Sequence, residues 1–231
     1  MMSIKEIVRN SAKKKSGSLG KGFLNGEPII CPDEVVAILE ITKEKCVFTD
    51  DFFGANNRKD TSYKNELPTI VLLLESPHIR EYNSIKPHPA MGKTGENIKK
   101  YFLNNLFKAV YISDLNQEGA YLQASSKIAF QKYRLILSNL VPYQCSLGIS
   151  LEETKNKEGK DDLLKKCIDE GKDEIIQQIA NLNPTIIINC CTKDIKNDIQ
   201  NMLNKAFPDK IRLEGCHPSS GFFASGFAIV R

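Results

Sequence analysis

Three short polar segments contain the residue types that could carry out chemistry, and each adjoins an apolar stretch. They are Glu75-Ser76-Pro77-His78, the Asn139 segment and His217-Pro218-Ser219-Ser220. A carboxylate can position a water or stabilise a cation, and an imidazole can face an oxygen on which negative charge develops. A side-chain amide can donate and accept hydrogen bonds at once. These side chains could form one site if the fold brings the three segments together.

The elements that precede these segments explain how they could meet. Residues 69–74 and 184–190 are continuous apolar runs rich in strand formers, and 211–214 is a shorter run. Continuous apolarity predicts strands that are covered on both faces, as in a parallel sheet. In an open α/β sheet the ligand binds beyond the carboxyl ends of the strands, so the polar segments are expected at one edge.

Apolar residues at helical spacing predict helices between the strands. The predicted helices are 96–109, 163–182 and 194–207, together with 4–12, 31–39 and 127–137. The charged stretch 152–162 is predicted to be an exposed insertion. Strands that alternate with helices indicate an α/β fold. We expect a three-layer α/β/α sandwich with a central, mostly parallel four-stranded sheet.

Two regions are predicted along the chain. Residues 1–66 are expected to be a helical and loop-rich lead-in packed on the core, and residues 67–231 to form the α/β domain. The basic cluster Lys13-Lys14-Lys15 is interpreted either as a phosphate-contacting arm or as a solvated flexible segment.

Composition places the chain among globular proteins. It has 231 residues, of which 41% are hydrophobic and 26% charged, and its net charge of +4 is compatible with a nucleic-acid partner without requiring one. Seven cysteines without a Cys-x-x-Cys pair predict reduced thiols and no metal site. No apolar run approaches the roughly 20 residues of a membrane-spanning helix, and the first residues lack the apolar region of a signal peptide. We therefore expect a cytoplasmic monomer with no membrane partner and no cofactor.

The polar segments, taken in order, resemble motifs of the uracil-DNA glycosylase superfamily. The stretch 71–77 is similar to the family's apolar strand that ends in a short polar motif with a proline, and 215–220 is similar to its final His-Pro-Ser motif. Between them, the loop 89–95 is similar to the proline- and glycine-bearing loop of the iron–sulfur branch. Residues 138–142 resemble the segment with the base-reading asparagine, and the resemblance covers residues 67–221.

This resemblance implies a DNA glycosylase-like hydrolase that cleaves the N-glycosidic bond of a flipped uracil or other modified base in DNA. It implies three catalytic residues, with Glu75 beside the sugar, His217 facing a carbonyl oxygen of the base and Asn139 reading the base. Phe222 or Phe223 would wedge into the duplex. The residues implied to bind substrate are Ser76, Pro77, His78, Pro89, Met91, Gly92, Gly95, Pro218, Ser219, Ser220 and Phe222.

The sequence departs from the family pattern at several positions. Leu74 replaces a glycine, Ser76 stands where the most active branch has a catalytic aspartate, and Ala90 stands where an aromatic residue stacks on the base. The N-terminal Cys-x-x-Cys of the iron–sulfur branch is absent, so no cluster is expected. The candidates to replace the missing ring are His88, Met91 and Phe102.

Two alternatives remain open. One is a catalytically inactive protein of the same fold that binds nucleic acid, a nucleotide or a protein partner. The other is a different nucleotide-processing hydrolase on a similar scaffold, since fold alone does not determine chemistry. A nucleotide-hydrolysing P-loop at Gly92-Lys93-Thr94 is not favoured, because Pro87 occupies the position of its first glycine.

Overall fold

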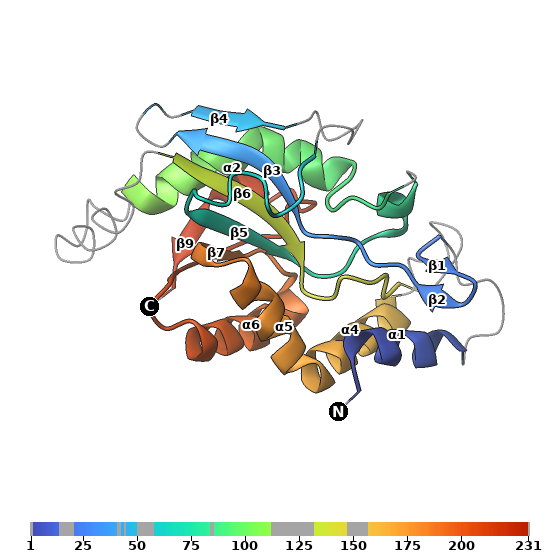
Figure 1. Ribbon diagram of the computed structural model, residues 1–231. Coiled ribbons are helices and arrows are strands. Elements are labelled where there is room, and N and C mark those ends of the chain that lie inside the picture. The colour runs from blue at the N-terminus through green and yellow to red at the C-terminus, as the bar shows by residue number, and fades with distance from the viewer. Residues whose placement is uncertain are drawn as a thin grey trace.

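Four adjacent parallel strands form the middle of a larger mixed sheet (Figure 1). They lie in the order β6 (Lys132–Asn139), β5 (Thr69–Leu74), β7 (Pro184–Asn189) and β8 (Ile211–Gly215), with parallel pairing at each step. All six residues of β5 are buried, which is the physical reason for its unbroken apolar sequence. The computed structural model describes residues 2–13, 21–40, 43, 45–49, 58–83, 86–111, 132–146 and 157–230.

Antiparallel strands extend the sheet on both sides. β3 (Glu34–Glu40) pairs with β6, β4 (Lys45–Phe48) pairs with β3, and β9 (Phe227–Ile229) pairs with β8. The sheet of the described residues therefore has seven strands, and the predicted number of four was wrong. The chain has a mixed α/β fold, and residues before position 67 supply two strands of the sheet.

Two segments predicted as helices are strands. The segment predicted as a helix from Cys31 to Leu39 contains β3, in which Val35, Val36 and Ala37 are completely buried. β-branched residues pack well between sheet neighbours, and this tertiary burial outweighs the helix-start signal of Pro32 and two acids. The predicted helix 127–137 contains the start of β6, and its residues before 132 lie outside the described part.

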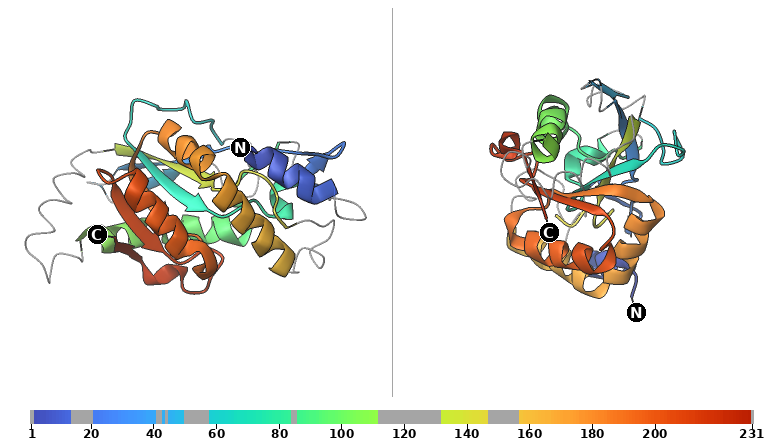
Figure 2. Two further views of the ribbon diagram at one scale, coloured as in Figure 1. Left: turned by 90° about the horizontal axis from the view of Figure 1, so that it is seen from below. Right: turned by 90° about the vertical axis from the view of Figure 1, so that its left-hand side faces the viewer.

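Helices cover both faces of the sheet. α1 (Ile4–Lys13), α4 (Lys157–Glu170), α5 (Lys172–Asn181) and α6 (Lys193–Ala206) pack on one face, as the view from below in Figure 2 shows. α2 (Lys93–Tyr111) and the short 3-10 helix η5 (Phe223–Ser225) pack on the other face. The helices predicted for 4–12, 96–109 and 194–207 are confirmed.

The predicted helix 163–182 is two helices that meet at Gly171. A Cβ on Gly171 would lie 2.3 Å from Ile4 Cγ1 and 2.6 Å from the Cys167 carbonyl oxygen, so only glycine allows α1 to approach this junction. α4 begins at Lys157, within the stretch predicted to be an exposed insertion, and residues 151–156 lie outside the described part.

A short β-hairpin with a two-residue turn follows the first helix. β1 (Phe23–Leu24) pairs with β2 (Glu27–Pro28), and Asn25 and Gly26 between them have φ of 53° and 80°. The Asn-Gly pair is a sequence signal for such a turn, because both residues tolerate positive φ. Lys14 and Lys15 of the basic cluster lie outside the described residues.

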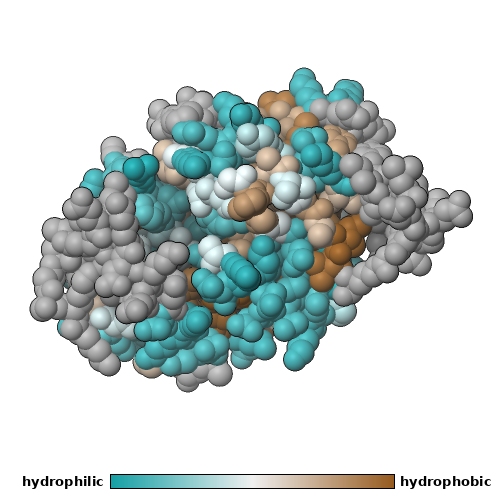
Figure 3. All heavy atoms as spheres, turned by 180° about the vertical axis from the view of Figure 1, so that it is seen from behind, coloured by the Kyte–Doolittle hydropathy of each residue, from teal (hydrophilic) through white to brown (hydrophobic). Residues whose placement is uncertain are grey.

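The surface of the described part is largely polar on the face opposite to that of Figure 1. Figure 3 shows this face as mainly hydrophilic, with hydrophobic residues in small separate groups. No helix among the described residues is long and apolar enough to cross a membrane.

Candidate functional site

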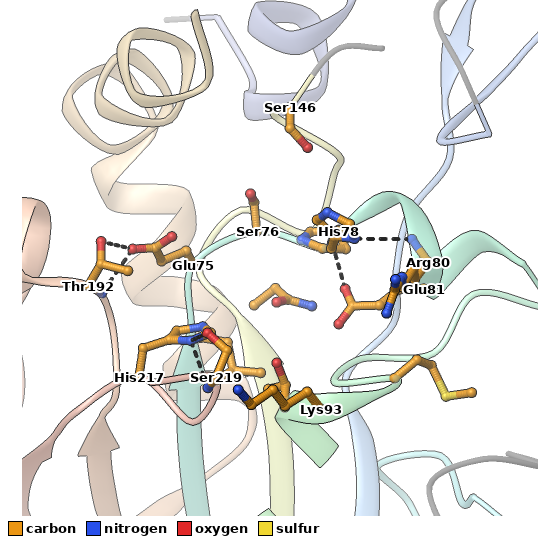
Figure 4. Close-up of a pocket in the computed structure, with 15 residues that line it drawn as sticks. Glu75, Ser76, His78, Arg80, Glu81, Lys93, Ser146, Thr192, His217 and Ser219 are labelled. Atoms are coloured by element: carbon orange, nitrogen blue, oxygen red, sulfur yellow. Dashed lines mark hydrogen bonds between the residues drawn. The ribbon is translucent and has the colours of Figure 1, made fainter. Parts of the chain in front are cut away.

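A pocket of about 530 Å³ lies beyond the carboxyl ends of the parallel strands. It brings together predicted site residues from segments far apart in the sequence, since Glu75 follows β5, Asn139 ends β6 and His217 follows β8 (Figure 4). The predicted residues in its wall are Glu75, Ser76, Pro77, His78, Met91, Asn139, His217 and Ser219. The remainder of the wall is Leu74, Arg80, Glu81, Lys93, Thr94, Ser146 and Thr192.

Glu75 is held by the first residues of α6. The residue is only 4% exposed, and its Oε1 accepts a hydrogen bond from the Thr192 backbone N–H at 2.8 Å and another from the Thr192 hydroxyl. Thr192 is the N-cap of α6 and gives its hydroxyl to Glu75 instead of capping its own helix. The positive end of the α6 dipole therefore faces the carboxylate of Glu75.

The imidazole of His217 is oriented by the residues that follow it. Its Nδ1 accepts a hydrogen bond from the Ser219 backbone N–H at 3.2 Å and lies 2.8 Å from the Ser219 Oγ. Because a backbone N–H can only donate, Nδ1 is the acceptor, and the neutral ring carries its hydrogen on Nε2. His217 is thus arranged as a hydrogen-bond donor through Nε2. The Asn97 side chain donates to the Pro218 carbonyl oxygen at 2.6 Å and ties this loop to α2.

Asn139 is 2% exposed and is positioned from two sides. Its Nδ2 donates to Cys31 Sγ at 3.8 Å, and its backbone carbonyl oxygen accepts a hydrogen bond from Gln178 Nε2 at 3.0 Å. Gln178 in turn lies 3.3 Å from an Asp33 carboxylate oxygen. With the amide anchored in this way, the Oδ1 atom and the second amide hydrogen can pair with a ligand that both donates and accepts.

Ser76 adds a buried hydroxyl to the pocket wall. Its Oγ is inaccessible to solvent and has no hydrogen-bond partner within the described part of the chain. A buried hydroxyl without a partner loses its interaction with water and gains nothing in return. A polar ligand atom in the pocket could restore that hydrogen bond.

A buried carboxyl closes the turn on the other side of the pocket. Glu81, in the 3-10 helix η2 (Ile79–Tyr82), accepts hydrogen bonds from the His78 N–H at 2.9 Å and the Ala90 N–H at 2.6 Å. It thereby joins the two ends of the loop 78–90. Burial raises the pKa of Glu81 to about 8, although these backbone donors act in the opposite direction.

An ion-pair group supports the same loop from behind. His88 Nδ1 lies 2.7 Å from an oxygen of Glu34, Arg58 Nη1 lies 3.6 Å from the other oxygen, and all three residues are buried. Arg58 also donates to the Pro89 carbonyl oxygen. Burial raises the pKa of Glu34, while His88 and Arg58 lower it. His88 therefore contacts Glu34 in the core and does not line the pocket.

The structure also shows which side chain could replace the aromatic ring that is missing at Ala90. Ala90 is completely buried with a φ of 57°, and Phe102 is buried in the core beside Phe227. Neither residue lines the pocket, whereas Met91 does. Of the three candidates to replace the ring, only Met91 reaches the pocket wall.

Several predicted substrate-binding residues lie outside the pocket wall. Phe222, beyond the His217 loop, is 74% exposed. Gly92 precedes α2 with a φ of 78°, a conformation that favours glycine. The predicted residues that do not line the pocket are Pro89, Gly92, Gly95, Pro218, Ser220 and Phe222.

The sequence reasoning missed six polar residues of the wall. Two of them had a recognisable signal: Thr192 directly precedes a helical pattern, as an N-cap does, and Glu81 stands three residues after His78, as in a capping box. The others depend on how the loops fold. The missed residues are Arg80, Glu81, Lys93, Thr94, Ser146 and Thr192.

Within the described residues, no group of three or more His, Cys, Asp or Glu side chains is arranged to hold a metal ion. Comparison with protein-family models, with curated proteins and with solved structures finds no match for this chain. The geometry of the site is therefore the basis on which a function can be proposed.

Proposed function

We propose that this chain is a DNA glycosylase-like hydrolase that cleaves the N-glycosidic bond of a flipped uracil or other modified base in DNA. The observation that carries the proposal is the meeting of Glu75, Asn139 and His217 in one pocket at the carboxyl edge of the sheet. The parallel strands β6, β5, β7 and β8, with helices on both faces, support a three-layer α/β/α sandwich of the kind found in the uracil-DNA glycosylase superfamily. We place the protein in the cytoplasm, acting as a monomer.

During the proposed reaction, negative charge develops on the base and positive charge on the sugar, and a different residue stabilises each. As the bond between the sugar and the base breaks, its electron pair moves to the base, and His217 Nε2–H can donate to the carbonyl oxygen that becomes negative. The sugar becomes cationic, and the Glu75 carboxylate can stabilise that charge and orient the water that attacks it. The water proton then leaves to the carboxylate or to solvent, the departing base anion takes up a proton from solvent, and the products are a free base and an abasic sugar.

Asn139 would recognise the base before the bond breaks. Its Oδ1 and remaining amide hydrogen offer an acceptor and a donor side by side, which matches one edge of a pyrimidine ring. Exposed Phe222 would occupy the gap that the flipped base leaves in the duplex.

The proposal is tested by base excision from oligonucleotides that contain uracil, hypoxanthine or modified pyrimidines. Wild type is compared with Glu75→Gln and His217→Ala, and with Lys205→Gln as a control on the last turn of α6. We expect excision by wild type and the control, and rates at least about 100-fold lower in both site variants. If wild type excises none of the bases tested, the proposed activity is refuted.

A second candidate function is binding without catalysis. The observations that favour it are Ser76, which stands where the most active branch of the family has an aspartate, and the engagement of Glu75 Oε1 by Thr192. Salt-dependent binding of oligonucleotides without excision would support this alternative.

A further inference from the structure

Helix α6 contacts both of the segments that carry the proposed charge-stabilising groups. Thr192 at its amino end donates two hydrogen bonds to Glu75. Lys196, four residues later, donates from Nζ to the Gly215 carbonyl oxygen at 2.5 Å, two residues before His217. Residues four apart lie on the same side of a helix, so one side of α6 reaches both segments. Figure 4 shows Glu75 and His217 together on one side of the pocket.

The Gly215 carbonyl lies just beyond the parallel ladder. The last paired residues of β7 and β8 are Asn189 and Glu214, so Gly215 is one residue past this pairing. A Cβ at Gly215 would lie 2.5 Å from the Phe227 ring, so the backbone is closely packed at this point. Backbone polar groups in such places need a hydrogen-bond partner, and Lys196 supplies it from α6.

The ammonium group of Lys196 is directed at the backbone and not at a carboxylate. Lys196 is half-buried and lines a cavity of about 310 Å³ together with Glu214 and Gly215. Within the described part of the chain, no salt bridge includes Lys196. A hydrogen bond from a charged donor is stronger than a neutral one, so this contact is suited to fixing the start of the His217 loop.

A second side chain holds the other end of the same loop. Asn97 of α2 donates from Nδ2 to the Pro218 carbonyl oxygen at 2.6 Å. Because α2 and α6 lie on opposite faces of the sheet, the loop 215–218 is tied to both faces, with His217 between the two bound carbonyl groups. Ser219 orients the imidazole within the loop, whereas these two contacts place the loop itself.

We propose that Lys196 and Asn97 are positioning residues that hold the loop 215–218 so that His217 stays in place relative to Glu75. Neither Lys196 nor Asn97 lines the pocket, so both act through His217 and not on the substrate. The inference rests on the proposed function for the catalytic role of His217, but the anchoring of the loop does not require catalysis. A small displacement of the imidazole would weaken its hydrogen bond to the developing negative charge.

The first measurement is ¹⁵N relaxation of the Cys216 and His217 backbone N–H groups in protein without ligand. Wild type should give order parameters of about 0.85, as in rigid backbone, and Lys196→Gln and Asn97→Ala should each lower them toward about 0.6. Lys205→Gln removes the same charge in the last turn of α6 and should leave the order parameters unchanged.

The second measurement is excision kinetics with a base that wild type releases. Lys196→Gln and Asn97→Ala should each lower kcat about tenfold with little change in KM, because the displaced imidazole stabilises the transition state less while base recognition at Asn139 is kept. Lys196→Arg keeps a cationic donor and should restore most of the rate. Lys205→Gln should react as wild type does.

The inference is overturned if the order parameters at Cys216 and His217 are the same in wild type and in both anchor variants, or if Lys205→Gln lowers them equally. An unchanged kcat in both anchor variants would overturn it as well, whether or not KM rises. Since the two anchors come from different helices, misfolding of one variant leaves the other to decide. If wild type excises no base, the proposed hydrolysis is refuted, and the order parameters alone decide whether these side chains hold the loop.

Discussion

Single side chains in this site are held by partners that the linear sequence does not reveal. Thr192 donates hydrogen bonds to Glu75 from both its backbone N–H and its hydroxyl. Glu81 accepts hydrogen bonds from the backbone N–H groups of His78 and Ala90. Thr192 thus binds Glu75 in place of capping α6, whereas Glu81 caps η2 and also holds the Ala90 end of the loop.

Replacing Thr192 by valine should slow the proposed reaction without preventing folding. The variant loses the hydroxyl bond to Glu75 but keeps the backbone N–H bond, so the carboxylate is less well oriented. We expect kcat to fall roughly tenfold with little change in KM, since a hydrogen bond to a charged group contributes about 1.5–3 kcal/mol. Thr192→Ser keeps the hydroxyl and should restore the rate. An equal loss in the serine variant would contradict this positioning role.

The buried Glu81 should make the protein less stable as the pH rises. Its pKa is about 8 in the fold against an ordinary value of 4.5, so the folded state binds the proton more tightly than the unfolded state between these values. Stability from this proton is fully present below about pH 4.5 and is lost as the pH rises through 8. Asp33, with a pKa raised to about 6, and Glu34 act in the same direction.

Chemical denaturation of wild type and Glu81→Gln from pH 5 to pH 9 measures this contribution. The free energy of unfolding should decline less steeply with pH in the variant, whose amide does not titrate, although the loss of one of two acceptor oxygens lowers its stability at pH 5. Parallel pH curves for the two proteins would show that Glu81 does not titrate in this range.

At the scale of elements, one side-chain contact and one backbone conformation determine where three helices begin or end. α4 and α5 are separate because Ile4 of α1 packs directly on Gly171 between them. α2 begins at Lys93 after Gly92, whose φ of 78° turns the chain out of the pocket loop. The start of α2 therefore belongs to the site, and the junction at Gly171 belongs to the core.

Substitution of Gly171 by alanine should destabilise the protein. The added methyl group would lie 2.3 Å from Ile4 Cγ1 and 2.6 Å from the Cys167 carbonyl oxygen, so α1 or the junction must shift. Overpacking of this kind costs about 1–3 kcal/mol. Urea denaturation of Gly171→Ala measures the loss, and Gly221→Ala, where no atom lies within 4 Å of the added Cβ, should change stability little. Equal stabilities of the two variants would mean that the junction adapts without strain.

At the scale of the whole molecule, the sheet places the site at one end of the fold and an exposed aromatic residue beyond it. Phe222 follows the His217 loop and is 74% exposed, although its neighbour Phe223 is buried in the core. Single exposed apolar side chains are common on protein surfaces, and Phe222 is the most exposed large one among the described residues. It is the side chain that would meet a duplex if the proposed base flipping occurs.

Phe222→Ala should therefore affect double-stranded substrates selectively. We expect excision from a duplex to fall about tenfold and excision from a single strand to change little, because only a duplex needs the gap to be filled. Leu24→Ala removes another exposed apolar side chain, 64% exposed on the β1–β2 hairpin, and should alter neither rate. A loss of equal size on both substrates would rule out the wedge.

The linear sequence indicated the buried strands and the polar residues that follow them. The apolar runs of β5 and β7 are unbroken because both faces of these strands are buried, and this pattern is visible in the chain itself. The predicted helices that became α1, α2 and α6 also follow from local periodicity. Glu75, Asn139 and His217 could be singled out because a parallel sheet brings the carboxyl ends of its strands to one edge.

Only the tertiary structure decided which neighbours complete the site. β3 is a strand because β6 pairs with it and the core buries it, although its local sequence begins like a helix. His88, a candidate to stack on the base, contacts the Glu34 carboxylate at hydrogen-bond distance because the loop folds back onto β3. Arg80, Glu81 and Thr192 reach the pocket through turns whose geometry depends on contacts with distant residues. Local periodicity thus determined the elements and the order of the motifs, and long-range burial and hydrogen bonding determined which side chains meet in the pocket.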